Sequence, residues 1–251
     1  MDHAEPQQSD KLVPGVRHAL WVLTRPAALF SRVEDTGAYG WTLATLLCLV
    51  MLVGYAQVQT GLIDRVVDRQ TEAKLAELEK TQLEAMGRLA LRDRMEALRK
   101  EGEFNKLLTR LGVVAFSPIY TLACFLAISS VLYAVVALSG SKPQYHTLMA
   151  ICVYSGVVVL VSQMLRLGMM VFYHTNEVDT SLGMLTPPGR PSVLAAVDPF
   201  RIWFWLLVAV GLTVTQQLSR RSALVTCAVL CLLAMGARVA LQYAPWGVKL
   251  S

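Results

Sequence analysis

Five long stretches of the sequence are almost free of charge, and they constrain the fold more than any other feature. They contain 19–27 residues each without a single Asp, Glu or His, and they are residues 41–60, 112–138, 147–173, 200–218 and 222–241. A helix needs about 20 mostly apolar residues to cross the hydrocarbon core of a bilayer. Only 16% of all residues are charged, whereas soluble domains carry about 25%. The pattern predicts an all-α polytopic membrane protein with five transmembrane helices.

Basic residues between these stretches indicate the orientation. Cytoplasmic loops are enriched in Lys and Arg, whereas long loops are translocated largely regardless of their charge. We therefore leave out residues 61–111, which hold eleven basic and ten acidic residues. The remaining count favours a cytoplasmic N-terminus and an extracytoplasmic C-terminus. The seven basic residues then on the cytoplasmic side are Lys11, Arg17, Arg25, Arg32, Lys142, Arg220 and Arg221, against Arg190, Arg201 and Lys249 on the other side.

Residues 61–111 have the composition of a charged helical arm. They hold 21 of the 41 charged side chains, contain no proline, and are rich in good helix formers. Both ends must meet the same membrane face, so the arm either reverses or lies on the surface. We favour an antiparallel hairpin that reverses at Gly87, with Gly102 as the alternative break. Apolar residues at roughly helical spacing predict a partner-binding face, namely Leu75, Leu78, Leu83, Met86 and Leu89. The alternative is a solvated helix without a partner.

The N-terminal segment carries a short amphipathic pattern. Arg32 points outward in the predicted helix, and its apolar face consists of Ala27, Leu29, Phe30 and Val33. Such a face suits the headgroup zone of a bilayer, and packing against the cytoplasmic ends of the spans is an equal alternative. The chain then divides into a cytoplasmic or interfacial segment (1–40), a first transmembrane helix (41–60), the extracytoplasmic arm (61–111) and a four-helix transmembrane region (112–251). Pro118 should loosen or kink the second span near Ser117.

Reactive groups are scarce in the five apolar stretches. Proton-coupled transporters and intramembrane metalloproteases need acidic or His side chains at depth, and none is present here. The chain also lacks an HExxH motif and a phosphate-binding glycine loop. Cys227 and Cys231 lie four residues apart without a visible third metal ligand, so small apolar packing is favoured. We expect no catalytic residue, no metal, no cofactor and no enzymatic activity.

Two cations, Arg166 and Arg238, lie within the apolar stretches near their predicted outer ends. A charge in lipid is costly, so pairing or snorkelling to the surface is expected. We predict a polar cluster in the outer leaflet that consists of Arg166, Arg238, Asp198, Arg201, Glu177 and Asp179. The cluster serves either as a set of stabilising pairs or as a site for a substrate or lipid headgroup.

Three segments together resemble the Yip domain family of five-span membrane proteins. Arg25-Pro26 with Leu29-Phe30 precedes the first span, as in many bacterial members. The stretch SGSKPQYHTL at 139–148, followed by Ala150, Val153 and Tyr154, is similar to the family's linker into its third span. The stretch VDPFRIW at 197–203 is similar to its entry into the fourth span, and Gly211 falls near an expected glycine. The resemblance covers about residues 15–245, with the arm as a bacterial-type insertion.

The resemblance implies a non-enzymatic scaffold or accessory subunit. Eukaryotic relatives are implicated in early secretory traffic and Rab GTPase association, and bacterial relatives are linked to ABC-type exporters with a periplasmic adaptor. The expected location is the bacterial inner membrane, and the expected partners are membrane lipids and an ABC-type exporter or adaptor, with no nucleic acid. The alternative function is a transporter or lipid-handling protein that uses the predicted polar cluster.

Overall fold

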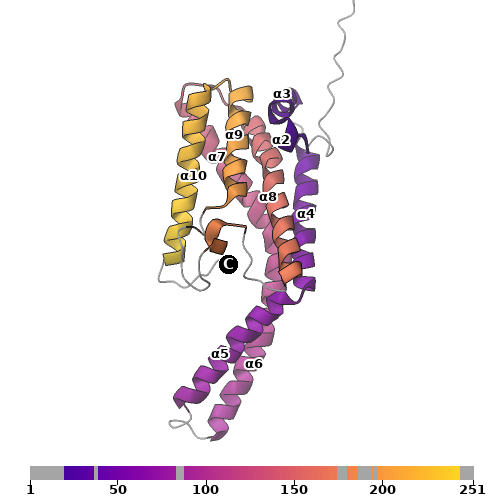
Figure 1. The fold of residues 1–251 in the computed structure, drawn as a ribbon, viewed down its shortest axis with the longest axis vertical. Coiled ribbons are helices and arrows are strands. Elements are labelled where there is room, and N and C mark those ends of the chain that lie inside the picture. Colours follow the sequence, from indigo (N-terminus) through magenta and orange to yellow (C-terminus); the bar gives the residue numbers. More distant parts are fainter. Residues whose placement is uncertain are drawn as a thin grey trace, which may run out of the picture. The chain divides into compact units, whose positions relative to one another are not determined.

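All regular elements in the described part of the chain are helices, as predicted for an all-α protein (Figure 1). The computed structural model describes residues 20–36, 39–82, 88–173, 180–185, 194 and 197–243. In chain order the elements are α2 (Trp21–Thr24), α3 (Pro26–Thr36), α4 (Gly40–Gln59), α5 (Leu62–Gln82), α6 (Arg88–Leu111), the π-helical turn η1 (Gly112–Phe116), α7 (Ser117–Leu138), α8 (Tyr145–Tyr173), the 3₁₀ turn η2 (Leu182–Leu185), α9 (Pro199–Thr215) and α10 (Arg220–Tyr243).

Four helical segments are long and apolar enough to cross a membrane, and a fifth is shorter. The four are Gly40–Gln59, Leu91–Leu138, Tyr145–Tyr173 and Arg220–Ala240. The fifth, α9, has 17 residues, which give about 25 Å of helix, close to the hydrocarbon thickness of about 30 Å. It ends before the predicted boundary because Gln217 adopts a left-handed φ of 50° and turns the chain toward α10. The five predicted apolar helices are therefore present.

The chain forms two compact units. The first consists of Met1–Leu46, Ala123–Ser162 and Thr180–Ser251, and the second consists of Leu47–Leu122 and Gln163–Asp179. In the first unit, α8 forms the core, since all side chains from Thr147 to Val158 are buried. Of the apolar window of α8, 72% is buried within the chain, compared with 11% for α10. The apolar windows of α4 and of the continuous α6–α7 segment are also only 28% and 22% buried, so these helices and α10 leave most of their apolar surface for lipid or partners.

Two glycines bring neighbouring helices close to α8. A Cβ added to Gly211 of α9 would lie 2.6 Å from Cγ2 of Ile151. A Cβ on Gly156 of α8 would overlap the ring of Phe125 in α7. Near the same core, the Thr42 hydroxyl donates to Tyr154 Oη at 3.3 Å. The absence of a side chain at these glycines is what permits the close approach.

Helix α3 packs on protein instead of lipid, which settles the two alternatives for the N-terminal segment. Leu29, Phe30 and Val33 are fully buried, and α3 lies against α9. The prediction that these three side chains face the bilayer was wrong, and the alternative of packing against the spans holds. Ala27 and Arg32 remain exposed. Because an apolar face contacts lipid and protein equally well, the sequence pattern could not separate the two cases.

The predicted disruption near Pro118 takes the form of the π-helical turn η1, directly before Ser117. Proline has no N–H to donate to the carbonyl four residues earlier. Single π-turns occur inside α-helices where the regular bonding is interrupted. Gly54 of α4 packs against this turn, since an added Cβ would lie 2.8 Å from the backbone oxygen of Val113. The helix nevertheless continues from α6 through η1 into α7.

Candidate functional site

The charged arm is an antiparallel hairpin of α5 and α6, as predicted. Asp64 pairs with Arg110, and Asp68 lies 2.7 Å from Nζ of Lys106. Further along the arm, a Cβ on Gly102 would lie 2.9 Å from Thr71. From one of these contacts to the next, the residue numbers rise on α5 and fall on α6, so the two helices run antiparallel. The chain reverses between Gln82 and Arg88. The alternative break at Gly102 is wrong because that residue lies inside α6, and Gly87 lies outside the described residues.

Ion pairs tie the two helices together at the end of the arm that adjoins the spans. Arg110 donates from Nε to Oδ1 of Asp64 at 2.9 Å and from Nη2 to Oδ2. These hydrogen bonds, more than the charge of Arg110 alone, lower the pKa of Asp64 below its usual value. Lys106 also contacts Glu103, at 3.0 Å, one turn away on its own helix. The hairpin is thus held by charge-assisted bonds as well as by apolar contacts.

Leu75 and Leu78, two of the predicted partner-binding residues, lie along the seam of the hairpin. Both are half-buried and share a helix face with Thr71, which contacts α6. Leu83 and Met86 lie outside the described residues, as does the side chain of Leu89, whose backbone belongs to α6. The partner-binding role of these five residues stays a prediction. Because Leu75 and Leu78 lie along the seam of the hairpin, they help to hold α5 against α6.

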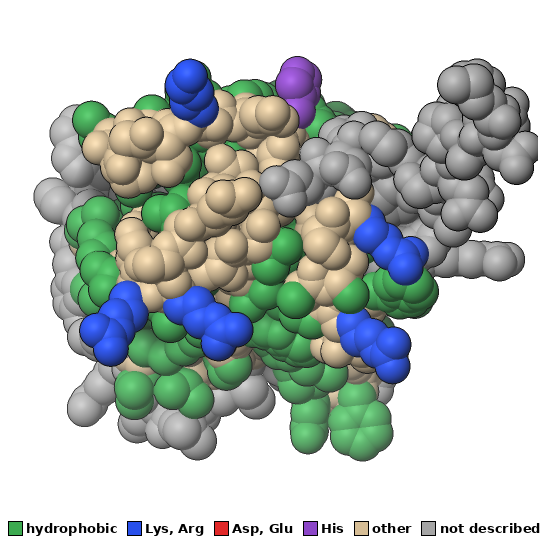
Figure 2. Space-filling view, turned by 90° about the horizontal axis from the view of Figure 1, so that it is seen from above, with side chains coloured by type: hydrophobic (Ala, Val, Ile, Leu, Met, Phe, Trp, Pro, Cys, Tyr) green, Lys and Arg blue, Asp and Glu red, His purple; other side chains and the backbone are tan. Residues whose placement is uncertain are grey.

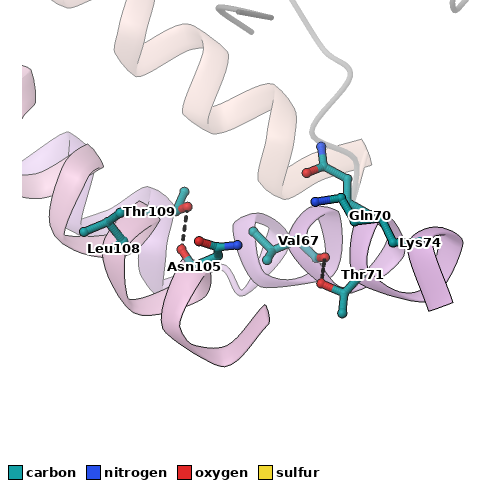
Figure 3. Close-up of a pocket in the computed structure, with 7 residues that line it drawn as sticks. All are labelled: Val67, Gln70, Thr71, Lys74, Asn105, Leu108 and Thr109. Atoms are coloured by element: carbon teal, nitrogen blue, oxygen red, sulfur yellow. Dashed lines mark hydrogen bonds between the residues drawn. The ribbon is translucent and has the colours of Figure 1, made fainter. Parts of the chain in front are cut away.

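An open groove of about 300 Å³ lies between the two arm helices (Figure 3). Its two threonine hydroxyls are bonded within their own helices, Thr71 to the Val67 carbonyl at 2.9 Å and Thr109 to the Asn105 carbonyl at 2.7 Å. None of the lining residues is an acid, a His or a Cys. It is lined by Val67, Gln70, Thr71 and Lys74 of α5 and by Asn105, Leu108 and Thr109 of α6.

One face of α6 presents an exposed apolar stripe that the sequence analysis missed. Phe104, Leu107, Leu108 and Leu111 are each 55–62% exposed. Their spacing of i, i+3, i+4 and i+7 places all four on one helix face. The signal was available in the sequence, but the charged residues between them, Lys106 and Arg110, obscured it. We call these four residues the α6 stripe.

The α6 stripe is not needed to span the hydrocarbon core of the bilayer. Helix α7 alone has 22 residues, which span about 33 Å at 1.5 Å per residue. That length already matches a hydrocarbon core of about 30 Å. The stripe precedes α7 and is separated from it by the five residues of η1. An exposed apolar face in such a position is a common mark of a protein interaction site.

The predicted polar cluster is partly visible. Asp198 caps α9, accepting a hydrogen bond from Phe200 N at 3.0 Å, and it lies 3.7 Å from Nε of Arg201. Since α9 and α10 pack as antiparallel neighbours joined by a short link, Arg238 falls near the same level of the unit as Asp198. Arg166 belongs to the second unit, and its Nε is buried without a hydrogen-bond partner in the described structure. Glu177 and Asp179 lie outside the described residues.

The cysteines do not form a metal site in the part of the chain that the structure describes. All five are free thiols. Cys152 and Cys227 are buried. No group of three or more His, Cys, Asp or Glu side chains comes together among the described residues. The intramembrane part of the described structure therefore offers packing surfaces and isolated cations.

The helices and their apolar surfaces define a multi-pass α-helical membrane protein. The family model of the Yip1 domain matches residues 21–241. This match covers most of the chain, so the protein belongs to the Yip1 domain family, in agreement with the resemblance found in its sequence. Neither a curated protein nor a solved structure matches the chain.

Proposed function

We propose that this protein is a non-enzymatic membrane scaffold or accessory subunit that binds a partner membrane complex through its arm. The partner we propose is an ABC-type exporter with its periplasmic adaptor. The arm then projects on the outer side of a bacterial inner membrane, with the N-terminus in the cytoplasm and the C-terminus outside. The distribution of basic residues outside the arm supports this orientation.

The α6 stripe is the observation that carries the proposal. Four apolar side chains are exposed on one face of an otherwise charged helix. Exposed apolar faces of this kind fit an amphipathic partner helix, with anchors at the i, i+3, i+4 and i+7 positions. The ion pairs of Asp64 and Asp68 with α6 support the role because they hold that helix in place. A preordered face binds a partner at a lower entropic cost.

Co-purification from intact membranes tests the proposal. We would replace Phe104, Leu107, Leu108 and Leu111 with Gln, crosslink in the membrane, and identify captured proteins by mass spectrometry. Capture of exporter or adaptor subunits should fall at least tenfold, whereas insertion and helix content should not change. The matched control replaces four exposed arm cations, Lys80, Arg92, Arg99 and Lys100, with Gln. Undiminished capture by the stripe variant would contradict the proposal.

A transporter or lipid-handling role is the second candidate, and the environment of Arg166 favours it. A guanidinium Nε that is buried without a partner in the described structure is costly in an apolar environment. An anionic substrate group would offset that cost. Vesicles reconstituted with this protein alone would distinguish the two functions. Transport or lipid transfer that is lost in Arg166→Ala or Arg238→Ala would support the second candidate and contradict the accessory role.

A further inference from the structure

One end of the first unit carries five exposed cations. They lie directly before α3, on α3, at the link from α7 to α8, and at the start of α10. The five are Arg25, Arg32, Lys142, Arg220 and Arg221. The contact of Tyr39 Oη with His146 Nδ1 at 3.5 Å places the start of α4 beside the start of α8 at this end. Figure 2 shows this face with several Lys and Arg side chains and no Asp or Glu side chain in view. We call these five residues the basic ring.

Acidic side chains do not balance the basic ring within the described part of this unit. Among the side chains that the structure describes in this unit, the single acid is Asp198, which caps the start of α9 and so lies at the opposite end of the helices. Helix α3 also contains Glu34 and Asp35, whose side chains lie outside the described set. The N-termini of α4, α8 and α10 lie at this end together with the C-termini of α7 and α9, so the helix dipoles largely offset one another and the charge of this end comes from the side chains.

The neighbours of the basic ring are those of a membrane–water boundary. The guanidinium of Arg32 lies 5.1 Å from the centre of the Trp21 ring, within cation–π distance. Trp41, at the start of α4, is 80% exposed, and Leu138, at the end of α7, is 87% exposed. Tryptophan is enriched at the level of the lipid headgroups. These residues place the cations at the depth where phosphate groups lie.

The position of the cations on the face indicates what binds them. In Figure 2 the Lys and Arg side chains lie around the edge of the face, and its centre shows mostly backbone and uncharged side chains. A soluble anion or an acidic protein segment would need several cations to converge on one place. Lipids instead surround the bundle, and each headgroup needs one or two cations at the rim.

We propose that the basic ring binds the phosphates of acidic phospholipids in the leaflet at this end of the bundle. The ring is separate from the arm, so the inference does not depend on the proposed partner. Each Lys or Arg near an anionic membrane surface strengthens binding by about fivefold. The combined effect gives the protein a marked preference for acidic over zwitterionic lipids.

Lipid retention by the full chain tests this inference. The wild-type protein would be exchanged into nanodiscs of equimolar phosphatidylglycerol and phosphatidylcholine, released, and examined by native mass spectrometry. The variant replaces all five ring cations with Gln, and the control replaces Lys74, Lys80, Arg92, Arg94 and Arg99 of the arm with Gln, which changes the net charge equally. The ratio of retained phosphatidylglycerol to phosphatidylcholine should fall at least tenfold in the ring variant and less than twofold in the control.

Three outcomes would overturn the inference. The first is an unchanged lipid ratio in the ring variant, and the second is an equal fall in the control, which would indicate net charge alone. The third is that inorganic phosphate stabilises the detergent-solubilised protein as much as phosphatidylglycerol does, which would indicate a site for soluble anions. If the variant with all five substitutions fails to fold, a double variant with Arg220→Gln and Arg221→Gln serves instead. It should lower the ratio of retained lipids at least fivefold. Replacing the same two residues with Lys should preserve it.

Discussion

Arg110 of α6 holds Asp64 of α5 in a two-pronged contact, although the two residues are 46 positions apart in sequence. Its Nε and Nη2 donate to the two carboxylate oxygens of Asp64. A planar guanidinium matches a carboxylate in this geometry, and such pairs are stronger than a single-point contact. The contact fixes the register of the hairpin at its base, next to the helix face that carries the α6 stripe.

Loss of this contact should loosen the arm without unfolding the spans. Because both side chains are partly exposed, Asp64→Asn should lower the hydrogen-exchange protection of α5 and α6 at pH 7 by about two- to fivefold. Glu96→Gln is the control, since it removes an exposed pair within α6 and leaves the inter-helix contact intact. Equal protection in the Asp64 variant and wild type would show that apolar contacts alone hold the hairpin.

The same contact predicts a pH dependence. The pKa of Asp64 is lower in the folded arm than its ordinary value of 3.8, chiefly through the hydrogen bonds from Arg110. Its stabilising effect is therefore complete above pH 3.8 and is lost as the pH falls through the lowered pKa. Protection of the arm, corrected for intrinsic exchange rates, should decrease below about pH 4 in the wild type. Asp64→Asn should lack this component of the decrease, and an identical pH profile would refute the assignment.

Gly211 should be intolerant of a side chain. An added Cβ would lie 2.6 Å from Ile151, whose branched side chain moves little inside the core. Gly211→Ala should lower the free energy of unfolding by about 1–3 kcal/mol, seen as a lower midpoint of thermal unfolding in detergent. Gly236→Ala is the matched control, because nothing lies within 4 Å of the corresponding position in α10. A midpoint for Gly211→Ala equal to that of the control would show that α8 and α9 can separate at no cost.

Gly102 and Thr71 should behave as a coupled pair. A Cβ at Gly102 would lie 2.9 Å from both Oγ1 and Cγ2 of Thr71, and Thr71→Ala removes both atoms. Alanine stabilises a helix by about 1 kcal/mol relative to glycine, but the contact should cancel part of that gain. Gly102→Ala should therefore protect the arm from exchange more strongly in the Thr71→Ala background. Additive effects of the two substitutions would contradict the close packing of the seam.

Asp198 should contribute to stability as a helix cap. The residue is 8% exposed, and its side chain accepts the hydrogen bond from Phe200 N. Asp198→Ala should cost about 1 kcal/mol, a shift of about 2–4 °C in the unfolding midpoint for a chain of this size. Asp198→Asn keeps the acceptor and loses the ion pair with Arg201, so it should cost less. A cost of Asp198→Asn as large as that of Asp198→Ala would assign the main effect to the ion pair.

Hydropathy and composition were sufficient to predict the helical spans, the hairpin and its reversal before α6. These features depend on local properties, since an uncharged stretch of about 20 residues has few alternatives to a spanning helix. The effect of Pro118 was likewise local. The turn η1 ends two residues before this proline, which has no N–H to donate to the carbonyl four residues earlier. The Asp-Pro start of α9 combined a capping side chain with a proline suited to the first turn.

Tertiary structure decided which apolar faces meet protein and which remain exposed. Leu29, Phe30 and Val33 pack under α3, whereas the equally apolar α6 stripe stays open. Leu75 and Leu78 turned out to lie along the seam of the hairpin. A leucine gains about as much from lipid or a partner helix as from its own chain, so its pattern in the sequence is the same in each case. The packing of the helices against specific neighbours in the folded chain selects among these environments.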